Sequence, residues 1–175
     1  MQKEDIPFKN YNHDVKMENG FHFTIDRDGH WYCHDPAMGV GPIKNERISK
    51  LFAGAGSGKF AGKGLSRDEN GRYWLKAPPA DVYGIDVEDV PFVVTSYELQ
   101  DEDLVLKTNF GEEVILDDRK SFILKDGVPY IEVRDGLMAR IGRNVFYQLA
   151  EKSVERDGKL GIMLGETFHE IGQAS

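Results

Sequence analysis

The sequence is poor in cysteine and contains no long apolar run, and both absences limit what the protein can be. Cys33 is the single cysteine among 175 residues, so an internal disulfide framework is excluded. No segment approaches the roughly 20 consecutive apolar residues that a membrane-spanning helix needs. The first residues, MQKEDIPFKNYNHD, lack the apolar stretch of a secretory signal peptide. We therefore expect a cytoplasmic protein with no membrane partner.

Positive charge is also scarce. The chain has 22 Lys and Arg against 30 Asp and Glu, which gives a formal net charge of −8 at pH 7. This balance and the absence of a basic run argue against nucleic acid as a partner. The 40% hydrophobic and 30% charged residues are ordinary for a soluble globular protein. A chain of this length can form one domain or two small lobes.

Short alternating segments separated by turn dipeptides predict β-hairpins. The dipeptides are Asp28-Gly29, Asn70-Gly71 and Asp126-Gly127, which suit tight turns with positive φ angles. A further meander is expected from Phe92 onward, and a last hairpin follows Asp157-Gly158. Strands joined by such short turns are antiparallel.

Two segments have the periodicity of amphipathic helices. The first is predicted at about residues 42–53, because proline at position 42 favours a helix start. The second is predicted from about 137 to 156, with Asp135 or Gly136 as its cap. The connection from Pro78 to Pro91 reads as irregular.

The order hairpin, helix, hairpin occurs twice, which predicts an α+β fold of two lobes with one main helix each. It favours an internal duplication, with IDRDGHWY matching ILKDGVPY locally; two coincidentally similar lobes are the alternative. The boundary is placed in the connection before Pro91. The expected parts are an N-terminal arm (1–19), an N-terminal lobe (20–88) and a C-terminal lobe (89–175).

The stretch LFAGAGSGKFAGKG, residues 51–64, resembles a phosphate-binding glycine loop but departs from its pattern. A P-loop needs glycine where Ala53 stands and Ser or Thr where Phe60 stands. A P-loop also links a strand to a helix, whereas this one is expected to leave a helix for a strand. We expect a connector, in which Lys59 and Lys63 are dispensable.

The segment HWYCHD, residues 30–35, suggests a metal site, with His22 as a further ligand. His30 and His34 share one face of a strand but lie about 13 Å apart along it, and Cys33 points to the other face. We therefore expect ordinary strand residues, no metal and no cofactor.

No catalytic motif is evident, and no nucleophile elbow of the GxSxG type occurs. Four carboxylates flank the lobe connection, and a solvated face is a simpler interpretation than acid–base catalysis. They are Asp81, Asp86, Glu88 and Asp89.

Three arginines, Arg134, Arg140 and Arg143, gather at the start of the second predicted helix. The positive end of a helix dipole disfavours cations, so these arginines need a negatively charged partner. One alternative is a carboxylate of the protein itself, such as Glu132 or Asp135. The other is a ligand phosphate or carboxylate, which helix N–H groups and guanidinium groups bind well.

These segments also carry a resemblance, because the chain is similar to the bacterial domain of unknown function family twelve eighty-five (DUF1285). The likeness covers about residues 20–172 and includes IDRDGHWYCHD, DVEDVPFVV, LKTNFGEEV and, most specifically, VPYIEVRDGLMARIGRNVFYQLAE. It implies two α+β lobes with a duplicated core, the C-terminal one loosely like a pleckstrin-homology barrel. It also implies a nucleotide-like ligand between the lobes and a role in signal transduction, but no catalytic residue.

The resemblance points by position to eight candidate ligand-binding residues: Asp28, Trp31, Asp89, Phe92, Asn109, Arg134, Arg140 and Arg143. The leading hypothesis is a non-enzymatic sensing module for a small anionic ligand in the cleft between the lobes. The arginines would contact the anion, Asn109 its polar edges, and Trp31 or Phe92 would stack on it.

Two alternatives stay open. One is a hydrolase or transferase of phosphorylated small molecules, with Asp28 or Asp89 as base. The other is an adaptor whose arginines meet an acidic, signalling protein partner.

Overall fold

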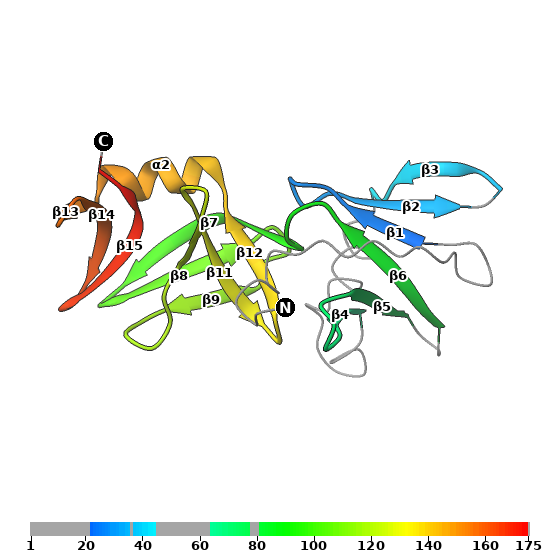
Figure 1. The fold of residues 1–175 in the computed structure, drawn as a ribbon, viewed down its shortest axis with the longest axis horizontal. Coiled ribbons are helices and arrows are strands. Elements are labelled where there is room, and N and C mark those ends of the chain that lie inside the picture. The colour runs from blue at the N-terminus through cyan, green and yellow to red at the C-terminus, as the bar shows by residue number, and fades with distance from the viewer. Residues whose placement is uncertain (1–21, 36, 45–63, 78–80, 175) are drawn as a thin grey trace. The chain divides into compact units, whose positions relative to one another are not determined.

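The computed structural model describes residues 22–35, 37–44, 64–77 and 81–174. The chain divides into two compact units. The first comprises Met1–Pro91 together with Arg134–Leu137, and the second comprises Phe92–Val133 together with Met138–Ser175. The described residues are mostly in strands, with one α-helix among them (Figure 1). The expected N-terminal arm lies outside the described residues.

The first unit contains a six-stranded sheet. Its strands are β1 (His22–Ile25), β2 (Trp31–Asp35), β3 (Gly39–Pro42), β4 (Gly64–Arg67), β5 (Tyr73–Ala77) and β6 (Asp81–Val87). Their order in space is β3-β2-β1-β6-β5-β4. Neighbours are antiparallel except at the centre, where β1 and β6 run parallel.

Alternation along these strands separates an apolar face from a polar one. The odd-numbered residues of β1, β2, β5 and β6 provide the core of this unit: Phe23, Ile25, Trp31, Tyr73, Leu75, Ile85 and Val87 are all buried. The even-numbered positions of β1 and β2 carry polar and aromatic side chains instead. Because side chains alternate across a strand, one face of the sheet forms the core and the other carries polar side chains.

The second unit contains another six-stranded sheet. Its strands are β7 (Phe92–Gln100), β8 (Asp103–Thr108), β9 (Glu113–Leu116), β10 (Ile123–Lys125), β11 (Val128–Arg134) and β12 (Leu137–Ile141). The order is β10-β11-β12-β7-β8-β9, and the central strands β7 and β12 run parallel. Both sheets therefore have the same topology. In each, the first three strands along the chain follow one another from the centre to one edge, and the next three follow one another from the opposite edge back to the centre.

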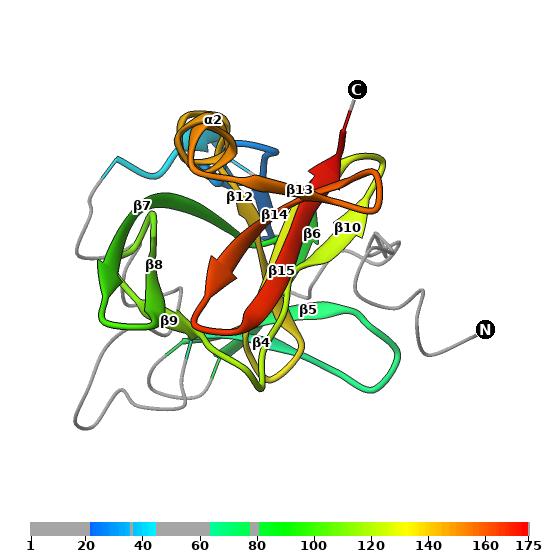
Figure 2. The same ribbon diagram turned by 90° about the vertical axis from the view of Figure 1, so that its left-hand side faces the viewer.

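One helix and a small sheet complete the second unit. They are α2 (Arg143–Glu151) and the strands β13 (Val154–Arg156), β14 (Lys159–Leu164) and β15 (Thr167–Gln173). The helix contacts β7 and β14 and buries Val145 and Leu149. Figure 2 shows β14 and β15 as a long antiparallel pair with β13 at its edge.

The second helix differs from its prediction. The expected helix over 137–156 is three elements: β12, α2 and β13. Asp135 and Gly136 do not cap a helix, because they have φ angles of 48° and 78° and form the turn between β11 and β12. The 100° periodicity matched by coincidence, since Leu137, Ala139 and Ile141 also alternate as strand residues, and all are buried.

The predicted turns are confirmed, whereas the predicted first helix and the predicted irregular connection are not. The turns at Asp28-Gly29, Asn70-Gly71 and Asp126-Gly127 each connect two antiparallel strands as predicted. The helix predicted over 42–53 lies mostly outside the described residues, and its first position ends strand β3. The connection taken as irregular contains β6, whose pairing with β1 across the unit was not visible from local spacing.

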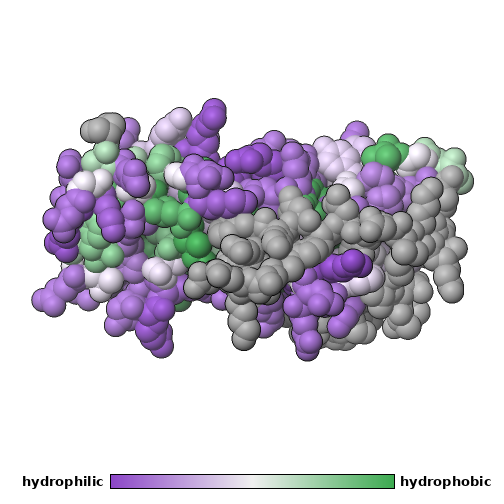
Figure 3. Space-filling model, in the orientation of Figure 1, coloured by the Kyte–Doolittle hydropathy of each residue, from purple (hydrophilic) through white to green (hydrophobic). Residues whose placement is uncertain are grey.

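No helix in the described part of the chain is long and apolar enough to cross a membrane. On the face seen in Figure 3 the described residues are mainly hydrophilic, and hydrophobic side chains form separate small areas.

Candidate functional site

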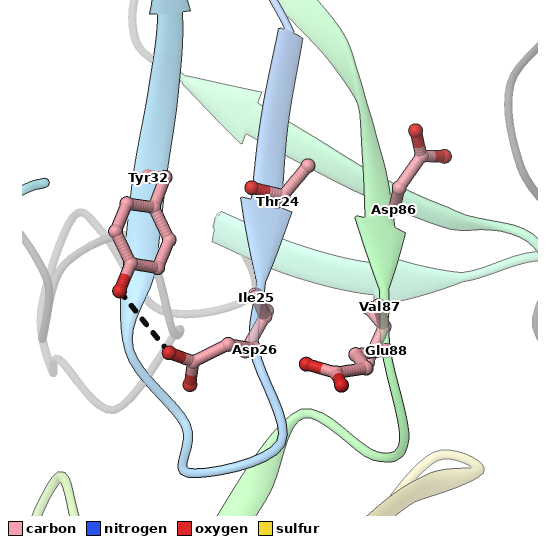
Figure 4. Close-up of a pocket in the computed structure, with 7 residues that line it drawn as sticks. All are labelled: Thr24, Ile25, Asp26, Tyr32, Asp86, Val87 and Glu88. Carbon is pink, nitrogen blue, oxygen red and sulfur yellow. Dashed lines mark hydrogen bonds between the residues drawn. The ribbon is translucent and has the colours of Figure 1, made fainter. Parts of the chain in front are cut away.

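The first unit has an open pocket of about 560 Å³ on the polar face of its sheet. Its lining residues come from the ends of β2, β1 and β6, as Figure 4 shows: Thr24, Ile25, Asp26, Tyr32, Asp86, Val87 and Glu88. The register of the three strands explains why these residues lie together. Thr24 is opposite Tyr32 on one side and Asp86 on the other, so the three side chains form a row across the sheet.

Asp26 directly follows β1 and fixes the hairpin at the rim of this pocket. Its carboxylate accepts hydrogen bonds from the backbone N–H groups of Asp28 and His30, both at 2.9 Å. It also accepts one from the Tyr32 hydroxyl at 3.2 Å (Figure 4) and contacts His30 Nδ1 at 3.3 Å. Burial opposes ionisation, but the His30 N–H, the Tyr32 hydroxyl and the His30 charge outweigh it, so the pKa of Asp26 is lowered. The same bond raises the pKa of Tyr32.

The neighbouring hairpin repeats this arrangement. Asp68 accepts from the N–H groups of Asn70 and Arg72 at 2.9 and 3.0 Å, and from Trp74 Nε1 at 2.9 Å. In both hairpins the glycine three residues after the aspartate donates back to the aspartate carbonyl. Asp26 and Asp68 therefore first serve to fix their turns, and a ligand at either carboxylate must compete with those bonds.

The remaining carboxylates give the pocket its charge. Glu88 accepts a hydrogen bond from the Arg27 N–H at 2.9 Å, and its own N–H donates to the Ile25 carbonyl. Asp86 lies 4.0 Å from His22 Nε2. Three carboxylates around one hollow favour a cation over an anion there. Of these three residues, Asp86 and Glu88 belong to the carboxylates for which the sequence predicts a solvated face, whereas Asp26 is not singled out by any sequence motif.

The predicted ligand-binding residues of the first unit lie in different settings. Asp28 is exposed in the turn after β1, whereas Trp31 and Asp89 are 2% and 9% exposed. The Trp31 ring therefore presents no open face for stacking. Arg134, at the end of β11, is half-buried and is grouped with the first unit.

In the second unit, three of the predicted residues converge on the start of β7. Arg140 on β12 is the register partner of Val93. Asn109 bonds the same residue twice: its Oδ1 accepts from the Val93 N–H at 3.2 Å, and its N–H donates to the Val93 carbonyl at 2.8 Å. Phe92 is fully buried against Phe110 and so offers no open ring.

Helix α2 begins beside this cluster. The Gly142 N–H donates to the Val94 carbonyl at 3.0 Å, and a Cβ on Gly142 would stand 2.6 Å from that oxygen. Glycine is needed there so that the helix start can rest on β7. No side chain caps α2, and its first turn holds no acidic residue. Arg143 is the first residue of α2 and is exposed, but Arg140 lies on the strand before it, which corrects the prediction that both belong to one helix.

Comparison with known proteins finds similarity to one family. Residues 91–171 match the model of the C-terminal domain of a protein family of unknown function, DUF1285. A DUF1285 family protein from Silicibacter pomeroyi DSS-3 has a similar structure, with a TM-score of 0.65 and 24% identity. That match covers 93% of this chain and 90% of the other.

A DUF1285 family protein from Shewanella baltica OS155 is also similar, with a TM-score of 0.54 and 21% identity over 77% of this chain and 94% of that one. No curated protein matches the chain. The resemblance expected from the sequence is thus confirmed: residues 91–171 match the DUF1285 C-terminal domain, and both similar structures are those of DUF1285 family proteins.

Proposed function

We propose that the protein is a non-enzymatic binding module for a small anionic ligand, with a nucleotide-like phosphate compound as the expected type. The observation that carries this is the start of α2, where an uncapped helix N-terminus has Arg143 as its first residue and Arg140 three positions before. The N–H groups of a first helical turn and the helix dipole attract negative charge. The Arg143 guanidinium stands at the same end of the helix, where a bound anion would offset its repulsion from the dipole.

The surrounding contacts support a preformed site on the second unit. Asn109, Arg140 and Gly142 are all fixed to the same two residues of β7, Val93 and Val94. Because β7 is a central strand of its sheet, these groups sit on rigid structure. Such fixed positions reduce the entropy that a ligand must overcome. Signal transduction, the role that the family resemblance implies, would use such binding as its input.

The test is thermal unfolding of the full chain with inorganic phosphate, pyrophosphate and a panel of nucleotides. We expect at least one to raise the melting temperature, since a ligand at 100 times its Kd stabilises by about 2.7 kcal/mol. Arg143→Gln and Arg140→Gln should remove this response. Arg143→Gln should leave the unliganded protein as stable or slightly more so. Arg72→Gln, an exposed arginine of the first unit, is the matched control and should respond like the wild type.

The outcomes separate the proposal from its alternatives. An Arg143→Gln protein that is destabilised when empty yet responds fully would return this arginine to a structural role. Conversion of the bound compound, followed by product analysis, would show a hydrolase or transferase. A wild-type chain that responds to none of these anions would contradict the proposal and favour an adaptor for an acidic protein.

We also propose that the two units arose by internal duplication and that the second is loosely pleckstrin-homology-like. The shared order of the two six-stranded sheets supports the duplication. The short likeness of IDRDGHWY and ILKDGVPY does not, because the first spans β1–β2 and the second β10–β11, and β10–β11 corresponds in order to β4–β5.

A further inference from the structure

The β14–β15 hairpin of the second unit carries a histidine in an apolar setting. His169 on β15 is 2% exposed, and neither ring nitrogen has a hydrogen-bond partner in the described part of the chain. Buried polar side-chain atoms are usually hydrogen-bonded, because an unpaired donor or acceptor loses its bonds to water without replacement. The anion site proposed above does not involve this residue.

The neighbours of His169 on the hairpin are apolar. Its register partner on β14 is Ile162, which is buried, and Ile171 lies two positions further along β15 and is also buried. Residues two apart on a strand, and residues opposite each other on antiparallel strands, point to the same face. The imidazole therefore belongs to the row of buried side chains with which the hairpin faces the core.

The hairpin is held to the rest of its unit by side-chain packing. Among the described strands, β13–β15 form a sheet of their own (Figure 2), so the backbone bonds of β14 and β15 stay within that sheet. Helix α2 contacts β14, and Glu102, between β7 and β8, lies next to Gly165 in the β14–β15 turn. A hairpin that is paired internally and attached through side chains can open as one cooperative piece.

The elements around the hairpin offer one charge that acts on His169. It is Asp117, directly after β9, whose carboxylate is bound by the Arg119 guanidinium at 2.9 Å. Helix α2 buries the apolar residues Val145 and Leu149. The charged groups nearest along the hairpin are on the opposite face of β15, where Glu170 lies 3.9 Å from Lys159 Nζ. Protonated His169 would thus be a buried cation in mainly apolar surroundings.

This setting makes the neutral imidazole the stable form of the packed hairpin. Burial lowers the pKa of His169 below its usual value of 6.5, and the Asp117 charge opposes this with a smaller effect. When the hairpin separates from the core, the ring reaches water and its pKa returns toward 6.5. The open form then binds a proton more readily than the packed form, so acid shifts the equilibrium toward opening.

We propose that His169 is a proton-sensitive switch whose protonation releases the β14–β15 hairpin from the core of the second unit. The opening is local, and it exposes the apolar side chains of Ile162, Leu164 and Ile171 to water. The switch acts below about pH 6.5, where an imidazole in water takes up its proton. It does not depend on the anion site proposed above.

The experiment is amide hydrogen exchange of the full chain at pH 7.5 and 5.5, corrected for the rates of an unstructured peptide. We expect the N–H groups of β14 and β15 to be less protected than those of β7 and β8 at both pH values, since the hairpin opens without global unfolding. The opening constant of the hairpin should rise by up to about tenfold from pH 7.5 to 5.5, the limit for one histidine of ordinary pKa in the open form.

Two variants assign the effect to the imidazole. His169→Leu cannot bind a proton, and His169→Gln keeps a polar side chain that stays neutral, so both should lose the rise in opening. His30→Gln, which removes an exposed histidine of the first unit, is the control and should keep it. Should His169→Leu fail to fold, His169→Gln decides.

Three results would overturn the proposal. Equal protection of β14–β15 and β7–β8 would show that the unit opens only as a whole. A hairpin opening that does not change between pH 7.5 and 5.5 would show that the proton does not release it. A rise that persists in His169→Gln would assign the pH dependence to another group.

Discussion

The two six-stranded sheets share one strand order but differ in what lies on them. In the second unit, α2 packs against β7 and the β13–β15 sheet is added to the core. In the first unit, the described residues leave a polar face with paired histidines and an acidic pocket. The strand order therefore determines which positions are neighbours. The side chains at those positions, and the elements packed on each sheet, determine which polar groups stay accessible.

The same contrast holds for the charges of the two candidate sites. The pocket of the first sheet is lined by carboxylates, whereas α2 starts with Arg143 and has neither a side-chain cap nor an acidic residue in its first turn. The first suits a cation and the second an anion. Two sheets of the same strand order thus carry opposite local charge, so a binding function depends on each site rather than on the fold.

The largest expected effect tests how tightly the second unit is packed. In Gly161→Ala, the new Cβ would stand 2.4 Å from Phe168 Cζ and 2.7 Å from the His169 carbonyl oxygen. The ring can move but the backbone cannot, so we expect a loss of about 2–4 kcal/mol in unfolding free energy. Gly41→Ala is the control in the first unit, because nothing lies within 4 Å of its Cβ. Urea denaturation with hydrogen exchange locates the loss. An unchanged Gly161→Ala midpoint would contradict this account of the packing.

A smaller effect compares the two aspartate-fixed hairpins of the first unit. Asp26→Ala removes a half-buried acceptor of two N–H groups and a hydroxyl, and we expect a cost of about 1–2 kcal/mol. Asp68→Ala removes a similar set at an exposed turn, so its cost should be lower. Asp26→Asn, which keeps one acceptor oxygen, should fall between wild type and Asp26→Ala. Equal losses for the two alanine variants would show that burial does not distinguish the hairpins.

The same carboxylates give the first unit an acid dependence of known sign. The folded-state pKa values of Asp26 and Asp68 are lowered, so their stabilisation is present above the unfolded pKa, near 3.9. It is lost as the pH falls through the lower, folded-state values. The loss between pH 5 and pH 2 should shrink in the Asp26→Ala chain.

The smallest expected effect concerns the buried His169 of the second unit. This residue is 2% exposed, and neither ring nitrogen has a hydrogen-bond partner in the described structure. Burial lowers its pKa, with Asp117 opposing weakly, so below about pH 6.5 the unfolded chain binds the extra proton more readily. Stability of this unit should fall as the pH drops from 7 to 5.

His169→Leu should reduce that fall and leave stability at pH 7 equal or higher, since it removes unsatisfied polar atoms. The exposed His30→Gln serves as the control, and unfolding midpoints at pH 7 and 5 provide the measurement. A pH dependence that persists unchanged in His169→Leu would assign it to other groups.

The sequence predicted the hairpins because their signals are local. Asp28-Gly29 and Asp126-Gly127 indicate tight turns independently of the rest of the sequence. The parallel pairs β1–β6 and β7–β12 could not be found in this way, since each joins segments about forty or more residues apart. The segment 137–141 was misassigned because its apolar spacing fits a helix as well as a strand.

The candidate sites follow the same division. Arg140, Arg143 and Asn109 were named from the sequence, and the structure places Arg140 and Asn109 on one residue of β7. Spacing along one strand separates His30 from His34, but it does not show that His34 stands opposite His22 on the neighbouring strand. A signal was available, since a turn at Asp28-Gly29 implies an antiparallel register that brings residues 22 and 34 together.

The parallel pair at the centre of each sheet also affects the order in which the strands can pair during synthesis. Strand β1 leaves the ribosome well before its central partner β6, which begins at Asp81. Until then β1 has one paired edge and one open edge, and the β4–β5 hairpin has no sheet to join. Closure of such distant strands is slow, and open edges attract other chains. The nascent first unit is therefore expected to need chaperone protection until β6 emerges, whereas each hairpin forms as soon as its turn is made.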